Sequence, residues 1–174
     1  MSTVDNLVKF IENCTSLTEL DLSWNELTPG SMKLLAKSLS KNRRLKYLNL
    51  SWNSLTTNEN TGLSDYKNDE SAITKGEIEV TNHLCKFLKQ SPELLSFDLS
   101  HTGLSSAMLL KFGPALRRAK ALINLCLNGN PGINLELVES LHKRAHCVPK
   151  IYPKLGCDII SKDHLTKIAD GHGI

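Results

Sequence analysis

The chain has 174 residues, of which 22% are charged and 40% hydrophobic, and its formal net charge at pH 7 is +3. That length suits one domain, which buries roughly two-thirds of the surface of its unfolded chain. The Lys and Arg residues are scattered, so the composition does not favour a nucleic-acid partner. No run approaches the ~20 apolar residues of a membrane-spanning helix, so we expect no membrane partner.

The N-terminal segment and the cysteines indicate a cytoplasmic protein. Asp5, Lys9 and Glu12 interrupt any apolar core of a signal peptide. The five cysteines are odd in number and show no paired spacing, so reduced thiols are the simplest interpretation. We therefore expect a cytoplasmic location.

The first predicted element is a helix over residues 4–13, which carries apolar residues at helical spacing. Two of them, Leu7 and Ile11, lie ten and six residues before Leu17. Apolar pairs at the same offsets precede each later strand: Leu35 and Leu39, Leu84 and Leu88, and Phe112 and Leu116. Because no strand of its own repeat precedes the first helix, we expect residues 1–16 to form an N-terminal capping helix; the alternative is that the sequence begins in the middle of a solenoid.

A short pattern then recurs along the chain. Residues 17–27 read LTELDLSWNEL and residues 45–55 read LKYLNLSWNSL, and both fit L-x-x-L-x-L-x-x-N-x-L. Two further copies begin at Leu94 and Leu122, and the spacing within each pair of copies is 28 residues. A period of this length predicts stacked units of one short strand, one loop and one helix. We expect four such repeats over residues 17–149.

The spacing between the second and third copies is 49 residues, and the surplus lies within residues 56–76, a polar stretch. This stretch predicts an insertion in the loop from strand to helix, with the helix resuming near Glu77. After the fourth copy, a fifth strand is expected at Ile151, flanked by Pro149 and Pro153. Proline is tolerated at sheet edges, so residues 150–174 are expected to form a C-terminal cap and tail.

The 28-residue period with a full helix in each repeat resembles the ribonuclease-inhibitor-like class of leucine-rich repeat proteins. The resemblance implies an α/β right-handed solenoid, with parallel strands on the concave face and helices on the convex face. It also implies protein binding by the strand face and its adjoining loops. The segments LDLSWN, LNLSWN and LCLNGNPGI further resemble the repeats of eukaryotic cytoskeletal and ciliary members.

The repeated asparagines Asn25, Asn53 and Asn130 stand where the chain leaves each strand. A buried amide there can satisfy backbone groups of its own and neighbouring turns, which are costly to bury unpaired. The third copy has Thr102 at this position, which replaces only part of the hydrogen bonding. We therefore expect the third repeat to be the weakest link of the ladder.

The candidate binding site is on the strand face and its rim. Trp24 and Trp52 occupy the same position of neighbouring repeats, so they are expected side by side at about one strand spacing, ~5 Å, with His101 next in line. Exposed tryptophans are typical anchors of protein interfaces. The alternative is that the two indoles pack on each other and shield the ladder from water.

Beside this rim, the outward positions of the strands form a polar patch. Asp21, Asn49 and Asp98, followed by Cys126, are predicted to form one row across the sheet, with Tyr47 nearby. Such a patch suits a partner that carries a few cations. An ordinary solvated sheet face is the alternative interpretation.

No catalytic or phosphate-binding motif is present, and no cofactor is implied. A zinc site could be considered at His142, His146, Cys147, Cys157 and His164. It is disfavoured, because Lys143 and Arg144 lie between the first two of these residues and would repel a divalent cation.

The sequence thus predicts a non-enzymatic protein-interaction module with a protein partner. The alternative is a structural subunit of a cytoskeletal or axonemal assembly. A GTPase activator is less favoured, because it needs a loop arginine and Arg43 and Arg44 are expected late in a helix.

Overall fold

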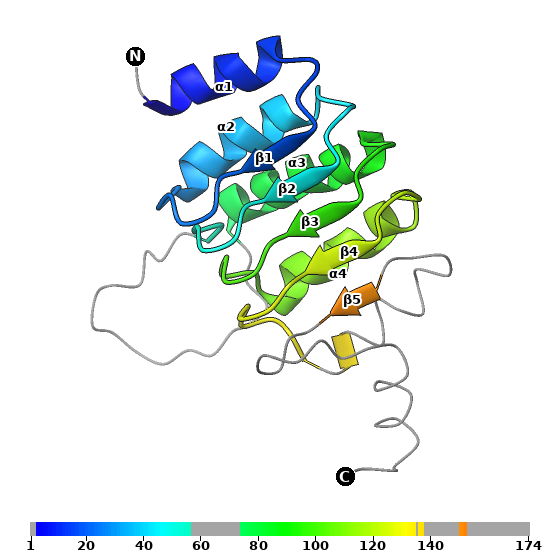
Figure 1. Ribbon diagram of the computed structural model, residues 1–174. Helices are drawn as coiled ribbons and strands as arrows, with labels where there is room; N and C mark the ends of the chain where they lie inside the picture. Colours follow the sequence, from blue (N-terminus) through cyan, green and yellow to red (C-terminus); the bar gives the residue numbers. More distant parts are fainter. Residues whose placement is uncertain (1–2, 57–73, 135, 138–149, 153–174) are drawn as a thin grey trace, which may run out of the picture.

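The computed structural model describes residues 3–56, 74–134, 136–137 and 150–152, the last three by their backbone alone. It has two layers, a five-stranded parallel sheet and a row of helices that covers one of its faces (Figure 1). The strands are β1 (Glu19–Asp21), β2 (Tyr47–Asn49), β3 (Ser96–Asp98), β4 (Asn124–Cys126) and β5 (Lys150–Tyr152). The helices are α1 (Thr3–Asn13), α2 (Pro29–Leu39), α3 (Lys75–Gln90) and α4 (Ser106–Leu116).

The strands follow one another in sequence order across the sheet, and their register reproduces the repeat. Leu20 pairs with Leu48, Leu48 with Phe97, and Phe97 with Leu125, so equivalent positions of successive repeats are direct neighbours. The fifth strand pairs in parallel with β4 and contains Ile151, where the sequence places it. The predicted α/β solenoid of repeats is therefore confirmed.

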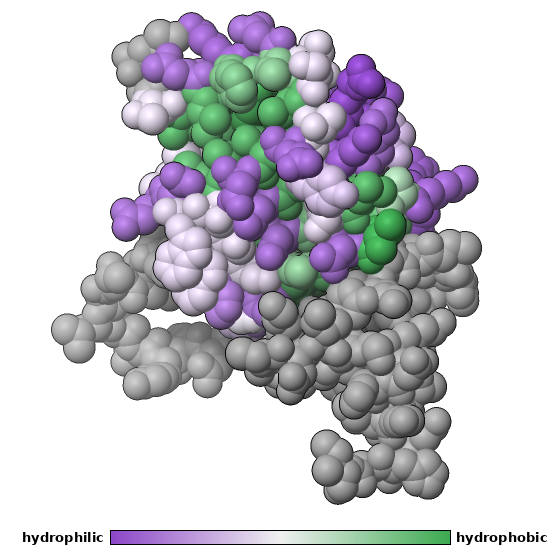
Figure 2. Space-filling view, in the orientation of Figure 1, coloured by the Kyte–Doolittle hydropathy of each residue, from purple (hydrophilic) through white to green (hydrophobic). Residues whose placement is uncertain are grey.

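The core lies between the sheet and the helices. The predicted apolar pairs of α2, α3 and α4 are at most 2% exposed, and they pack against the inward leucines of the strands. Leu7 is only half-buried, because α1 has no strand of an earlier repeat beneath it. Figure 2 shows apolar surface at this end of the solenoid, where Val8, Leu17 and Leu20 are also only partly buried. Each fully buried aliphatic side chain contributes ~1.5–3 kcal/mol to the free energy of folding.

Hydroxyl side chains define where three helices begin. Thr28, Thr74 and Ser105 accept a hydrogen bond from a backbone N–H of the first turn of α2, α3 and α4, which otherwise lacks a partner. Glu77 completes a capping box with Thr74, so α3 starts at Lys75, two residues before the predicted position. The rest of the predicted insertion, residues 57–73, lies outside the described residues.

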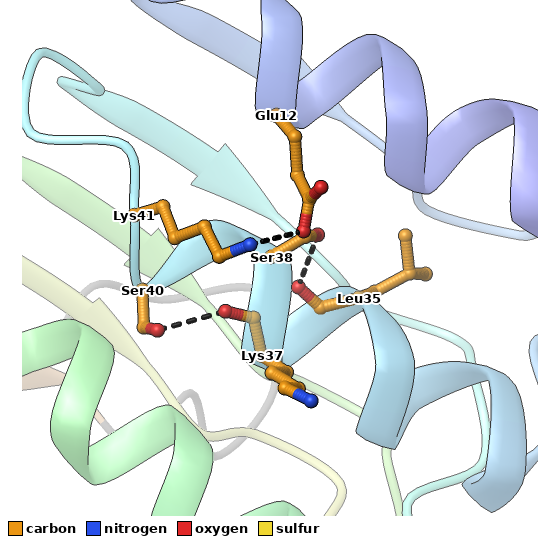
Figure 3. Close-up of polar contacts among 6 residues, drawn as sticks. All are labelled: Glu12, Leu35, Lys37, Ser38, Ser40 and Lys41. Carbon is orange, nitrogen blue, oxygen red and sulfur yellow. Dashed lines mark hydrogen bonds and ion pairs between the residues drawn. The ribbon is translucent and has the colours of Figure 1, made fainter.

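Two serine side chains form hydrogen bonds at the C-terminal end of α2, and an ion pair connects this end to α1 (Figure 3). The hydroxyls of Ser38 and Ser40 donate to the carbonyl oxygens of Leu35 and Lys37. The Lys41 Nζ atom lies 2.7 Å from Glu12 Oε1, so an exposed ion pair joins the C-terminal ends of α1 and α2. Such a pair is worth at most ~1 kcal/mol, so it aligns the two helices more than it stabilises them.

The asparagine ladder forms between repeats, although its first member was predicted wrongly. The Asn53 amide donates to the carbonyls of Leu22 and Leu50, and its oxygen accepts from the N–H groups of Asn25 and Leu27. Asn130 bridges the third and fourth repeats in the same way. Asn25, expected to be buried, is exposed, and its side-chain amide donates to its own turn, at the Ser23 carbonyl, because no earlier strand turn lies beside it among the described residues.

Thr102 fills its place in the ladder only in part, as predicted. Its hydroxyl donates to the Leu99 carbonyl at 2.7 Å, which reproduces the bond that Asn53 and Asn130 make to the leucine three residues earlier. Among the described residues this hydroxyl reaches no group of the second repeat. Leu55 instead donates its N–H to the backbone carbonyl of Thr102 at 2.9 Å. The second and third repeats are therefore joined here by backbone alone.

Candidate interaction surface

The turn that follows each strand has, at one equivalent position, a residue in the left-handed backbone region; the first and third turns contain a second such residue, Glu26 and Gly103. The φ angles are 58° at Trp24, 58° at Trp52, 54° at His101 and 65° at Gly129. The first three donate their backbone N–H to a carbonyl of the next repeat, at 3.1, 3.0 and 2.7 Å. Because the same conformation recurs in register, their side chains leave the solenoid in the same direction.

Trp24, Trp52 and His101 stack into one aromatic column. The ring centroids of Trp24 and Trp52 are 4.1 Å apart with 14° between the planes, and those of Trp52 and His101 are 3.9 Å apart with 13°. Trp24 is 68% exposed and Trp52 43%. Gly129 ends the column, since a Cβ atom there would lie 2.1 Å from the His101 ring. The predicted side-by-side arrangement is confirmed.

The column does not belong to the core. A bulky residue in the left-handed region costs on the order of 1–3 kcal/mol, and three residues bear this cost. Each stacked aromatic pair returns ~0.5–1.5 kcal/mol, so two pairs do not clearly offset it. The leucine layer beneath is complete without these rings. The column therefore consists of exposed rings at a turn position where a residue with a side chain is strained.

Asp21, Asn49, Asp98 and Cys126 form the predicted row across the sheet. The Asn49 amide donates to Asp21 at 3.1 Å, and Asp98 accepts the Ser100 N–H at 2.8 Å. Hydrogen bonds from the Ser23 hydroxyl and N–H hold the pKa of Asp21 below its ordinary 3.8, against the opposing effect of burial, and Asn49 adds to the lowering. Asp21 is therefore ionised at neutral pH.

Two hollows are found beside the column. A depression of about 260 Å³ on the strand face is lined by Glu19, Leu20, Asp21, Tyr47, Leu48, Asn49, Ser96 and Asp98. A groove of about 800 Å³ on the loop side includes Trp52, His101, Glu26, Glu77, Pro29 and Pro131 in its lining. In each repeat the column residue stands in sequence between the strand that lines the depression and the loop that lines the groove.

The structure thus brings together all seven residues of the predicted site. Trp24, Trp52 and His101 form the column, and the other four line the depression. Their role in binding stays a prediction. Sequence reasoning missed Glu26 and Glu77, which are far apart in the chain yet line one groove. The capping-box spacing from Thr74 to Glu77 was the available signal for the second of them.

Several other predictions concern residues outside this surface. Arg43 and Arg44 were expected late in a helix, but α2 ends at Leu39 and both lie in the loop before β2. Among the described residues, no cluster of three or more His, Cys, Asp and Glu side chains could hold a metal ion. The residues weighed for zinc, from His142 to His164, lie outside that set. No helix within the described part of the chain is long and apolar enough to cross a bilayer.

The parallel register and the repeating strand, turn and helix define a solenoid repeat protein. A family model described as Leucine Rich repeat matches residues 13–36 and 41–58. The architecture and this family match together support a leucine-rich repeat solenoid. No curated protein sequence matches it.

Solved structures extend this likeness over nearly the whole chain. The tropomodulin C-terminal domain of Caenorhabditis elegans is 10% identical with a TM-score of 0.61, and the match covers 97% of this chain and 90% of that one. Leiomodin-1 actin-binding site 2 is 14% identical with a TM-score of 0.67, and the match covers 99% and 92%. At these identities the likeness is one of fold.

Proposed function

We propose that this chain is a non-enzymatic protein-interaction module, whose partner binds the aromatic column, the strand-face depression and the adjoining loops. The observation that carries the proposal is the column itself: exposed rings, outside the core, on backbone that is costly to form. Aromatic side chains are the commonest anchors of protein interfaces. The proposed location is cytoplasmic.

Rigidity supports a role in recognition. Trp52 is held between two rings, and its backbone N–H is bonded to Ser100 of the next repeat, so its rotamer is set before a partner arrives. Ordering a free side chain on binding costs ~0.5–1.5 kcal/mol, and a preorganised ring avoids most of that cost. A partner therefore gains more of the contact energy from this surface than from loose side chains.

The experiment is affinity capture on the intact chain followed by calorimetry with the captured protein. Trp24→Ala is expected to weaken binding by ~2 kcal/mol, or about thirtyfold, because it removes the most exposed anchor. Leu34→Ala is the matched control, since Leu34 is an exposed apolar residue of α2, away from the column. Unchanged affinity of Trp24→Ala, together with a large fall in melting temperature, would show that the column serves packing and not binding.

A cytoskeletal partner is the second candidate. It is favoured by the structural likeness to a tropomodulin domain and to a part of leiomodin-1 that is named as an actin-binding site. Co-sedimentation of the chain with actin filaments and, separately, with microtubules tests this candidate. Pelleting that is lost in Trp24→Ala and kept in Leu34→Ala supports it, whereas recovery of the wild-type chain only in the supernatant contradicts it.

A further inference from the structure

We propose that the partner segment bound beside the aromatic column is basic and extended, with Arg or Lys side chains at every third residue. This inference rests on the proposed function, because it names the chemistry of the segment that the same surface receives. Three features of the described residues carry it: the charges that line the two hollows, the exposed aromatic surface between them, and the spacing of the carboxylates.

The charge balance around the column is opposite to that of the whole chain. The chain has 21 Lys and Arg against 18 Asp and Glu. Among the residues that the structure describes, the depression is lined by Glu19, Asp21 and Asp98 and the groove by Glu26 and Glu77, with no Lys or Arg in either lining. Five carboxylates thus flank the rings on two sides. A basic segment is complementary to this surface, whereas an acidic segment would be repelled.

The aromatic surface is suited to the same cations. The inner ring faces of the column are used by stacking, but no other ring of the described residues stacks on the outer face of Trp24, which is 68% exposed. The Tyr47 ring is 45% exposed and lines the depression together with Asp21 and Asp98. A cation over a Trp or Tyr face is attracted by the negative face of the ring, in addition to its attraction to nearby carboxylates. The guanidinium group of Arg is planar and suits both contacts.

The spacing of the row sets the spacing of the cations. Asp21 and Asp98 occupy the same row and are separated by one intervening strand, β2. Two strand spacings amount to about 9.6 Å. A polyproline II segment rises ~3.1 Å per residue with three residues per turn, so its residues i and i+3 lie on one side about 9.3 Å apart. A segment crossing the strands in this conformation places successive basic residues opposite Asp21 and Asp98.

The test uses a synthetic peptide, (Pro-Pro-Arg)₄, with (Pro-Pro-Gln)₄ and (Pro-Pro-Glu)₄ as length-matched probes. Trp24 and Trp52 are the only tryptophans of the chain, so their emission reports binding at the column directly. We expect the Arg peptide to bind, to change the emission, and to bind more weakly as salt is raised, because the carboxylates are exposed to screening. The Gln and Glu peptides are expected to bind at least tenfold more weakly.

Charge removal supplies the second arm. The double variant Asp21→Asn/Asp98→Asn keeps acceptor oxygens for Ser23 and Ser100 and is expected to weaken the Arg peptide about three- to tenfold. Glu136→Gln, which lines neither hollow, is the control and is expected to change nothing. Equal binding of the three peptides, no binding of the Arg peptide, or unchanged affinity in the double variant overturns the inference. If the binding of the captured protein is still weakened by Trp24→Ala in that case, the proposed interaction module is retained and only the basic character of its partner is rejected.

Discussion

Two adjacent residues in every repeat lie in different environments. The first, at Trp24, Trp52, His101 and Gly129, is exposed. The second is buried at Asn53, Thr102 and Asn130, and exposed only at Asn25. Both rows run along the solenoid in the same register, one residue apart in the chain.

The difference shows how one turn serves two purposes. The buried row forms hydrogen bonds with backbone groups of adjoining turns, as Asn53 does with Leu22 and Leu27. Its residues therefore contribute to the stability of the stacked repeats. The aromatic side chains of the exposed row stack on one another, while the backbone N–H groups of the same residues bond the next repeat. Its chemistry is therefore free to vary with the partner while the repeats stay intact. The first three predictions below separate the two rows, and the fourth concerns the neighbouring strand face.

The largest effect is expected in the buried row. Asn53→Ala leaves the backbone groups of Leu22, Leu27 and Leu50 without their side-chain partner and should lower the free energy of unfolding by ~1–3 kcal/mol. Asn25→Ala, the matched control one repeat earlier, should stay within ~0.5 kcal/mol, because that side chain is exposed and bonds only its own turn. Urea unfolding of both variants measures the difference. Equal losses would contradict the assignment of Asn53 as a bridge between repeats.

Gly129→Ala tests the end of the exposed row. A side chain at φ 65° is strained, and its Cβ would displace the His101 ring from Trp52, so a loss of about 1–2 kcal/mol is expected. Tryptophan emission should change with it. Gly76→Ala is the control, since nothing lies within 4 Å of a Cβ built there in the first turn of α3. If Gly129→Ala has the same melting temperature and emission spectrum as the wild type, the His101 ring does not pack against this glycine.

Thr102→Asn extends the buried row where it is interrupted. An asparagine can add the bonds to the second repeat that the Thr102 hydroxyl does not make, so the change should be neutral or stabilise by up to ~1 kcal/mol. Differential scanning calorimetry measures the shift. A clear fall in melting temperature would mean that the packing of the threonine methyl group outweighs the missing hydrogen bonds.

The smallest effect concerns pH. Hydrogen bonds from Ser23 lower the pKa of Asp21 in the folded state below 3.8, so its ionised form adds stability above about pH 4. That contribution is lost as the pH falls through the folded-state pKa. The difference in melting temperature between the wild type and Asp21→Asn should therefore shrink between pH 6 and pH 3. The expected size is under ~0.5 kcal/mol, because the group is exposed. A difference in melting temperature that stays constant over this range would show that ionisation of Asp21 does not contribute to stability.

The sequence by itself determined the repeat, the register and the core. A period of 28 residues places Leu20, Leu48, Phe97 and Leu125 in one row, because equivalent positions of stacked units become neighbours. The same argument brought Trp24, Trp52 and His101 together, and it put Asp21, Asn49 and Asp98 beside them. Periodicity is a local property of the chain, so it can be read without coordinates.

Only the tertiary structure decided what depends on contacts between repeats. Asn25 matches the pattern yet is exposed, since burial needs an earlier turn that the first repeat does not have. The left-handed conformation of Trp24 and the stop at Gly129 follow from the packing of neighbouring turns, not from the pattern of residue types. The groove that joins Glu26 to Glu77 forms across the turns of four successive repeats. Such features are set by the geometry of packed turns, to which no single segment of the sequence corresponds.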